Sequence, residues 1–280
     1  MTPRRNEDAA STASSLSAPV SSSLPLDAAC VPPAVVSLPL LLRQPLAEPD
    51  WIVPGLLPVG VSLLAGPATV DKALLANQLG LSIACGLPFL RRYPVRQGRV
   101  LYLALAESSL QVRGRAASLL RQQSSPETFH LAFQWSPFRQ GGLADLEDTM
   151  AGLEDLRLVI VDPLEFVQPL RHDGGTGSRT RQGNFSEAAL TFFVPLRELA
   201  TRYNLALLLL HHLSDDRAHH QRDPLAGLSP TGLTAASACN LLMSPRADPH
   251  TCELHLAGVH VAERRLSLVY DSARGEWQEA

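Results

Sequence analysis

The sequence predicts an α/β fold with a mostly parallel sheet that is flanked by helices and extended by antiparallel strands near the C-terminus. Short stretches that are apolar at every position, such as 158–161 and 205–210, alternate with longer stretches of helical spacing. Strands that are apolar on both faces are typical of parallel sheets, because helices cover both sides of such sheets. After residue 238 the helical stretches stop and strands follow one another directly, which indicates an antiparallel extension. These last strands are predicted at 241–243, 252–258 and 266–270.

Two parts of unequal length are expected along the 280 residues. Residues 1–45 are rich in Ser, Ala and Pro and poor in aromatics, which predicts a disordered leader, and residues 46–280 form the predicted domain. In the domain, helix 72–85 has Leu75, Leu79 and Ile83 on one face. The other predicted elements are, in order, strand 61–65, strand 100–105, helix 109–123, strand 129–135, helix 143–156, strand 158–161, helix 185–203 and strand 205–210.

Charge and cysteine usage narrow the class of protein. Lys and Arg number 24 and Asp and Glu 27, so the formal net charge of −3 supplies no overall basic field for DNA or an acidic membrane. A local basic loop is still compatible with this count. None of the four cysteines are spaced as CxxC, which favours a reduced, cytoplasmic setting over a disulfide framework or a zinc ribbon. No charge-free run of about 18 apolar residues is present, so no membrane-spanning helix is expected.

A possible phosphate-binding motif lies between strand 61–65 and helix 72–85. A P-loop has the pattern G-x-x-x-x-G-K-[ST], and this chain has Gly66 and Lys72 at the required separation. Lys72 is the only lysine in the chain, and it falls where the pattern places the ammonium group that neutralises phosphate oxygens. An ordinary strand–turn–helix with an incidental lysine is the alternative interpretation. The predicted nucleotide-binding residues are Gly66, Pro67, Ala68, Thr69, Val70, Asp71, Lys72 and Ala73.

Two positions depart from the P-loop pattern. Ala73 lacks the hydroxyl group that would bind Mg²⁺, so one metal ligand is missing. Asp71 replaces a glycine, and its carboxylate would face phosphate; at about 4 Å and an effective dielectric constant near 20, the repulsion is about 4 kcal/mol. The same carboxylate is favourable at a helix N-terminus, where it accepts from backbone N–H groups. We therefore expect Asp71 to occupy part of the anion site itself.

Four blocks of sequence, in this order, resemble the RecA-like P-loop ATPases, in particular the branch of the plasmid replicative helicase RepA. They are the approach to the P-loop at 55–67, the strand 99–105, the strand 158–164 and the strand 207–212 that ends in paired histidines. The resemblance extends from Trp51 to about Trp277. It implies a RecA-like sheet, a site for ATP and Mg²⁺, and assembly into homo-oligomers with nucleotide between the subunits.

The same resemblance implies roles for single residues. Asp162, at the end of the Walker B strand, would hold Mg²⁺ through water, and His212 is a catalytic candidate or a polar group beside the site. The family has its water-activating glutamate at the place of Ala106, so Glu107 serves as a catalytic residue only if the backbone turns there, because adjacent strand residues point to opposite faces. Single-stranded DNA would contact the Gly- and Arg-rich loop after Walker B, although a solvated surface loop is the alternative. The candidates in this loop are Arg171, Arg179 and Arg181.

Three functions follow from these observations. The first is a RecA-fold protein related to RepA-type helicases that binds ATP weakly, has reduced or lost hydrolysis and acts with replication or repair proteins. The second is an active ATP-dependent helicase or ATPase with an unusual loop. The third is an interaction module that binds no nucleotide. Hydrolysis needs a metal, an activated water and charge neutralisation, and the departures at positions 71, 73 and 106 impair the binding of nucleotide, metal and water, so the first function is favoured.

Overall fold

The central sheet is built from strands that are buried on both faces. A computed structural model describes residues 37–43, 49–121, 123–168, 182–213 and 237–280. The chain divides into two compact units, Met1–Ala47 and Glu48–Ala280. In the first unit the described part is the helix α1 (Leu38–Arg43) and the residue before it. The leader predicted at 1–45 lies mostly outside the described residues and stays a prediction.

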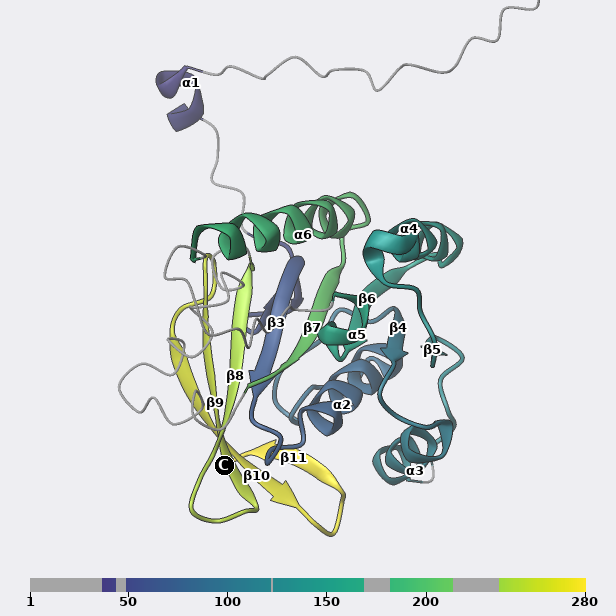
Figure 1. The fold of residues 1–280 in the computed structure, drawn as a ribbon. Helices are drawn as coiled ribbons and strands as arrows, with labels where there is room; N and C mark the ends of the chain where they lie inside the picture. The colour runs from purple at the N-terminus through teal and green to yellow at the C-terminus, as the bar shows by residue number, and fades with distance from the viewer. Residues whose placement is uncertain (1–36, 44–48, 122, 169–181, 214–236) are drawn as a thin grey trace, which may run out of the picture. The chain divides into compact units, whose positions relative to one another are not determined.

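In the second unit, nine strands form one sheet in the order β11-β10-β9-β8-β3-β7-β6-β4-β5 (Figure 1). From β8 to β5 all neighbours are parallel, and from β8 to β11 all neighbours are antiparallel. A separate hairpin pairs β1 (Trp51–Val53) with β2 (Leu57–Pro58). The strands of the large sheet are β3 (Gly60–Gly66), β4 (Arg99–Ala104), β5 (Phe129–Ala132), β6 (Leu156–Asp162), β7 (Ala206–His212), β8 (Cys239–Pro245), β9 (Thr251–Gly258), β10 (Arg264–Asp271) and β11 (Glu276–Glu279).

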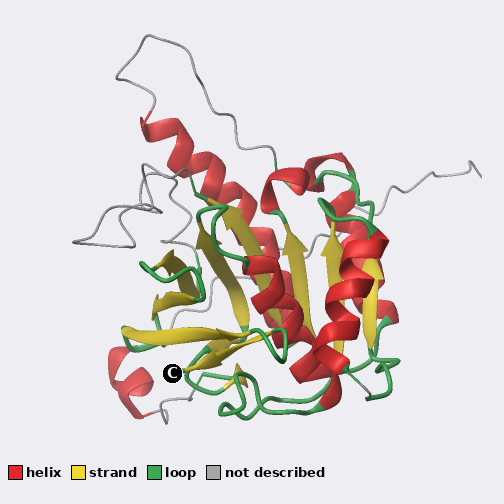
Figure 2. Ribbon diagram, turned by 90° about the horizontal axis from the view of Figure 1, so that it is seen from below, coloured by secondary structure: helices red, strands yellow, loops and turns green. Residues whose placement is uncertain are grey.

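Helices cover both faces of this sheet (Figures 1 and 2). On one face lie α2 (Lys72–Cys85) and α3 (Ser109–Leu120), and on the other lie α4 (Gly142–Gly152) and α6 (Gln182–Arg202). Two shorter segments are α5 (Leu164–Val167), which directly follows β6, and the 3-10 turn η1 (Phe138–Gln140). The layers therefore run helix, sheet, helix, as expected of a parallel sheet.

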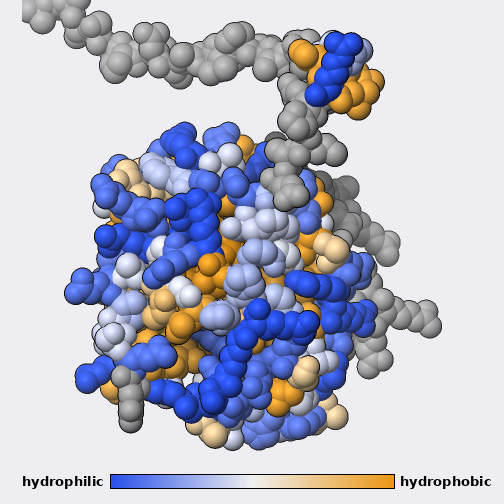
Figure 3. Space-filling model, turned by 180° about the vertical axis from the view of Figure 1, so that it is seen from behind, coloured by the Kyte–Doolittle hydropathy of each residue, from blue (hydrophilic) through white to orange (hydrophobic). Residues whose placement is uncertain are grey.

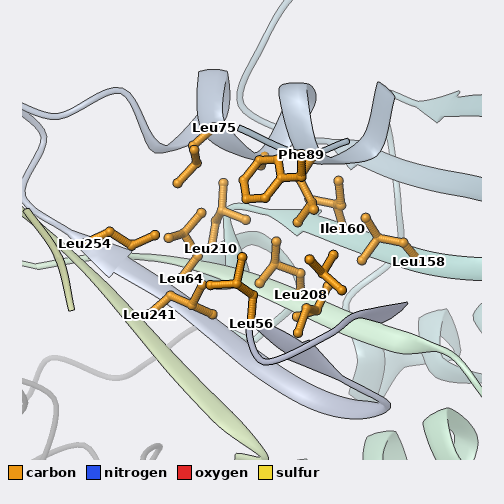
Figure 4. Packing of buried hydrophobic residues seen from close by; sticks show 14 of the residues in the cluster. Leu56, Leu64, Leu75, Phe89, Leu158, Ile160, Leu208, Leu210, Leu241 and Leu254 are labelled. Carbon is orange, nitrogen blue, oxygen red and sulfur yellow. The ribbon is translucent and has the colours of Figure 1, made fainter. Parts of the chain in front are cut away.

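Alternation of side chains along the strands produces two separate cores. Leu208 and Leu210 of β7 share one core with Ile160 of β6 and with the apolar residues of α2, as Figure 4 shows. The intervening residues of β6 and β7 pack against α4 and α6 on the other side. The same alternation places the side chains of Asp162 and His212 on the α2 side of the sheet. Packing of the apolar residues thus decides which polar side chains meet at the strand ends.

The predicted fold class is confirmed, and the predicted elements occur in the expected order. One strand was assigned wrongly in part: β8 pairs in parallel with β3, and the antiparallel extension begins only at its other edge. The direction of a strand is set by its connection, and the connection to β8 runs through residues 214–236, outside the described part. The edge strand β11 escapes prediction because Trp277 is its only apolar residue.

The surface of the second unit mixes hydrophilic and hydrophobic residues, as the face in Figure 3 shows. Large apolar side chains that are exposed in the described part include Leu87, Leu110 and Phe166. Single exposed apolar residues are common on folded proteins and indicate no function by themselves. None of the described helices has the length and apolar character that crossing a membrane requires.

Candidate functional site

The carboxyl ends of the parallel strands meet at one edge of the sheet. Gly66 ends β3, Asp162 ends β6 and His212 ends β7, and Gly66 is the register partner of His212. The N–H of Leu213 donates to Gly66 O at 3.0 Å and ties the start of the loop to the end of β7. Ligands of open parallel sheets bind at this edge. The topology therefore brings the loop, Asp162 and His212 to the place where a ligand is expected.

Lys72 is the first residue of α2, and its side chain turns back over the loop. The Nζ atom donates to Pro67 O at 2.7 Å, and the residue is only 3% exposed. Burial lowers the pKa of Lys72 to about 8, against the attraction of three carboxylates, those of Asp162, Asp71 and Glu165. The ammonium group is therefore still mostly protonated near pH 7 and lies among carboxylates rather than in solvent.

Asp71 caps α2 from the position where the P-loop pattern has glycine. Its Oδ1 atom accepts from Leu74 N–H at 2.8 Å. This amide is one of the first N–H groups of the helix, which are the groups that hold an anion at a helix N-terminus. Two further amides of the loop donate within it, Val70 N–H to Pro67 O at 3.4 Å and Lys72 N–H to Val70 O at 3.0 Å. The loop thus uses three donors internally that a bound phosphate could take.

Asp162 is held by a chain of hydrogen bonds from β4 and α2. Tyr102 Oη donates to Asp162 Oδ2 at 2.6 Å, and Asn77 Nδ2 donates to Tyr102 Oη at 3.3 Å. Burial raises the pKa of Asp162 to about 6, although the hydrogen bond from Tyr102 opposes the rise. Burial and the charge of Asp162 also raise the pKa of Tyr102 well above its usual value, so Tyr102 stays protonated and remains the donor. At neutral pH Asp162 is mainly ionised.

Glu107 reaches the site through a bend between β4 and α3 and is paired with Arg115. Arg115 Nη1 donates to Glu107 Oε2 at 2.6 Å, and Arg115 Nη2 lies 3.8 Å from Asp71 Oδ1. Burial disfavours the charge of Arg115, but the hydrogen bond to Glu107 and the charge of Asp71 raise its pKa above the usual value. We call these three side chains the Asp71–Arg115–Glu107 bridge. It connects the phosphate loop to the candidate catalytic glutamate.

The paired histidines differ in their surroundings. His211 is buried, with Nδ1 2.5 Å from Glu165 Oε1, and the same oxygen accepts from His212 N–H at 3.2 Å. Although burial of Glu165 has the opposite effect, the hydrogen bond with His211 lowers the pKa of this carboxyl group. The side chain of His212 is exposed, and partial desolvation together with the charge of Lys72 lowers its pKa. His212 is therefore a neutral imidazole near pH 7, close to Lys72.

Negative charge predominates among these side chains, the histidines aside. The described cations are Lys72 and Arg115, and the carboxylates are Asp71, Glu107, Asp162 and Glu165. Four carboxylates against two cations leave the site with two negative charges, so a polyphosphate needs a divalent cation to enter. No three His, Cys, Asp or Glu side chains in the described part are grouped to bind a metal directly. A magnesium ion here would therefore depend on water and phosphate oxygens, which suits its chemistry.

A pocket of about 370 Å³ lies beside the loop. Its walls come from residues 69–71, from the turn between β8 and β9, and from Tyr270 and Trp277. The ring of Tyr270 lies 6.2 Å from that of His250 and nearly parallel to it. Flat aromatic and proline surfaces suit a planar base. A larger hollow of about 970 Å³ lies along the other half of α2, but no predicted nucleotide-binding residue lines it, so the smaller pocket is the better candidate for a nucleotide.

The structure places Glu107, Asp162, His212 and the loop 66–73 at one end of the sheet. The predicted DNA contacts Arg171, Arg179 and Arg181 lie outside the described residues, so they stay predictions. Sequence patterns did not indicate Tyr102, Arg115 or Glu165. Tyr102 is hidden in an apolar strand, yet it shares a face with Ala104, the register partner of Asp162, and this alternation is a signal that could have identified it.

Comparisons with known proteins agree with this arrangement. A family model described as an AAA domain matches residues 28–218. An ATPase domain of known structure is 12% identical to this chain, with a TM-score of 0.59, and the match covers 79% of this chain and 85% of that one. The RadB recombinase is 16% identical with a TM-score of 0.53, and the match covers 80% of this chain and 92% of that one. At such identities the two structures show a shared fold alone. No curated protein matches the sequence.

Proposed function

This chain belongs to the AAA domain family, and from that premise we propose that it is a RecA-fold P-loop protein that binds ATP with Mg²⁺ weakly and hydrolyses it slowly or not at all. Family and fold support the presence of a nucleotide site. The hydrogen bond from Leu74 N–H to Asp71 carries the weakness, because it fills an anion position with the protein's own carboxylate. A nucleotide must displace that carboxylate before its phosphates can reach the amide.

Several features of the site suit a nucleotide. Lys72 supplies the ammonium group for phosphate oxygens, and the pocket lined by Tyr270 and Trp277 offers a surface for a base. Asp162, ionised at neutral pH, would hold Mg²⁺ through water. Ala73 presents a methyl group where a P-loop has its hydroxyl ligand, so the protein contributes less to metal binding than the full pattern would. Bound Mg²⁺ would neutralise phosphate charge.

Slow hydrolysis is supported by the state of the candidate base. A carboxylate that activates water needs a free oxygen within hydrogen-bond reach of that water. Glu107 instead holds Arg115 at 2.6 Å, and this contact removes one of its two oxygens from such a role. His212 lies near Lys72 as a neutral imidazole and is the second candidate for contact with phosphate or water. Because the charge of Lys72 lowers the pKa of His212, this imidazole is a weak base for activating water.

The biological setting is also part of this proposal. The four sequence blocks resemble RepA-type replicative helicases, which suggests action in DNA replication or repair, in the cytoplasm and as a homo-oligomer. Single-stranded DNA would meet the loop that holds Arg171, Arg179 and Arg181. Replacing these three arginines with glutamine should weaken binding of a fluorescent oligonucleotide and reduce its salt dependence. Equal affinity of the variant and the wild type would remove DNA from the proposal.

Two other functions compete with this one. An active ATPase or helicase would tolerate the unusual loop, and a pure interaction module would bind no nucleotide. Lys72 argues against the interaction module, because the chain keeps its only lysine buried beside Asp162, where its charge is unfavourable. A side chain without charge would fit a purely structural role better.

One experiment separates the three functions. Purified protein is titrated with ATP and Mg²⁺ by calorimetry, and phosphate release is measured with and without single-stranded DNA. The proposed function predicts binding in the high micromolar to millimolar range and turnover below roughly 0.1 per second. Faster turnover that disappears in Lys72→Ala would establish the active ATPase instead. No heat of binding at millimolar ATP would favour the interaction module.

A further inference from the structure

We propose that Arg115 is a phosphate-binding residue of this site, which Asp71 and Glu107 hold in place until a nucleotide displaces the Asp71 carboxylate. The P-loop pattern contains no such residue, since Arg115 belongs to α3, more than 40 positions after Lys72. Arg115 would act within the nucleotide site proposed above, so this assignment rests on the proposed function. It names the group that compensates for the two departures in the loop.

A single oxygen atom marks the position of the anion. Asp71 Oδ1 accepts from Leu74 N–H at 2.8 Å, and the same Oδ1 lies 3.8 Å from Arg115 Nη2. A phosphate oxygen that replaces this carboxylate oxygen would therefore meet both a helix N-terminal amide and a guanidinium group. Both kinds of donor are well suited to binding phosphate in proteins. The Asp71 carboxylate is in this sense a built-in substitute for the phosphate.

The shape of the guanidinium group allows this exchange without breaking the rest of the bridge. Nη1 of Arg115 donates to Glu107, and Nη2, the other terminal nitrogen, faces Asp71. A phosphate can therefore take the Nη2 end while Glu107 keeps the Nη1 end. A lysine at this position would present one point charge and could not hold both partners in the same geometry. Glu107 then acts as a positioning residue, because it fixes the direction in which the fork points.

The exposures of the three side chains favour the exchange as well. The side chain of Asp71 is 49% exposed, so it can rotate into water when phosphate arrives, and no buried charge is left unpaired. Arg115 and Glu107 are much less exposed, at 18% and 15%, and stay in place. The cost of the exchange is the loss of one helix cap, which the phosphate itself replaces at the Leu74 amide.

A double-mutant cycle tests this assignment. ATP and inorganic tripolyphosphate, each with Mg²⁺, are titrated by calorimetry into the wild type, Asp71→Gly, Arg115→Gln and the double variant. Asp71→Gly should bind both ligands more tightly. Adding Arg115→Gln to Asp71→Gly should then weaken binding about tenfold, since a charge-assisted hydrogen bond is lost. Arg113→Gln is the matched control, because it removes the same charge from an exposed position of the same helix and should leave both affinities unchanged.

The possible results separate this assignment from the proposed function. If the double variant binds as tightly as Asp71→Gly, Arg115 acts only as the partner of Asp71 and the assignment is wrong, while the nucleotide site stands. An equal loss in Arg113→Gln would reduce the effect to general electrostatics and would also overturn it. If not even Asp71→Gly binds ATP or tripolyphosphate, both proposals fall. Should Arg115→Gln fail to fold by circular dichroism, Arg115→Lys replaces it, and an unchanged affinity in the Asp71→Gly background contradicts the assignment.

Discussion

The burial of Lys72 has a free-energy cost that can be measured. The residue is 3% exposed, and burial lowers its pKa from 10.5 to about 8. Each pKa unit corresponds to about 1.4 kcal/mol, so the charged form destabilises the folded state by about 3 kcal/mol at pH 7. Methionine has a similar length and no charge. We therefore expect Lys72→Met to raise the free energy of unfolding at pH 7 by up to about 3 kcal/mol, less the hydrogen bond to Pro67.

The pH dependence of stability follows from the same shift. Between pH 8 and 10.5 the unfolded chain keeps a proton on Lys72 that the folded protein has released. Stability of the wild type therefore rises with pH through this range, because the unfolded state binds more protons. Below pH 8 both states are protonated and the full penalty applies; above 10.5 neither is charged and the penalty is gone. The stability difference between Lys72→Met and the wild type should shrink accordingly from pH 8 upward.

Urea denaturation followed by tryptophan fluorescence, at several pH values from 7 to 10.5, measures this difference. No second lysine exists for a control, so Arg113→Met removes a cation from an exposed position of α3 and should change stability by less than about 0.5 kcal/mol. A Lys72→Met protein that is less stable than the wild type at pH 7 would refute the reasoning. The contacts of the ammonium group would then outweigh its burial.

Three further predictions concern the same end of the sheet. Asp162→Asn should stabilise the protein by up to about 3 kcal/mol at pH 7, and this gain should vanish as the pH falls from 6 to 4, where the pKa of Asp162 lets the wild type take up its proton; a variant less stable at pH 7 would contradict this. Tyr102→Phe removes the donor to Asp162 and should cost about 1–3 kcal/mol and raise the pKa of Asp162 further, and an unchanged urea midpoint would argue against it. Gly66→Ala would place a methyl group 2.6 Å from Met243 O and should destabilise by about 2 kcal/mol or more, whereas Gly114→Ala, with no atom within 4 Å, is the control and should be neutral or slightly stabilising; equal melting temperatures for the two variants would show that the loop gives way.

Strand and helix positions were accessible from sequence where one periodicity dominates. The residues of β6 and β7 are apolar on both faces, and α2 has the bounds predicted from its apolar spacing and from Gly86. The direction of β8 was not accessible, because an apolar pattern contains no record of the connection that precedes a strand. The edge strand β11 was hidden by its polar residues, which are usual at a sheet edge.

Contacts within the site were harder to predict than its location. The P-loop pattern located the loop 66–73, and the strand ends located Asp162 and His212. The contact of Arg115 with Glu107 depends on how the chain bends after Ala104 and on where α3 then lies, which are tertiary properties. Such a pair, eight residues apart, has no periodic signal in the sequence.

A chain with one lysine offers a spectroscopic advantage. Lysine enriched in carbon-13 or nitrogen-15 would give a single side-chain resonance, and that resonance would come from the centre of the candidate nucleotide site. Because the pKa of Lys72 is lowered to about 8, its titration falls within the range that a folded protein tolerates. Arrival of a phosphate should shift the resonance and move the titration upward. The native protein thus carries its own reporter at this position, and no residue has to be replaced to observe it.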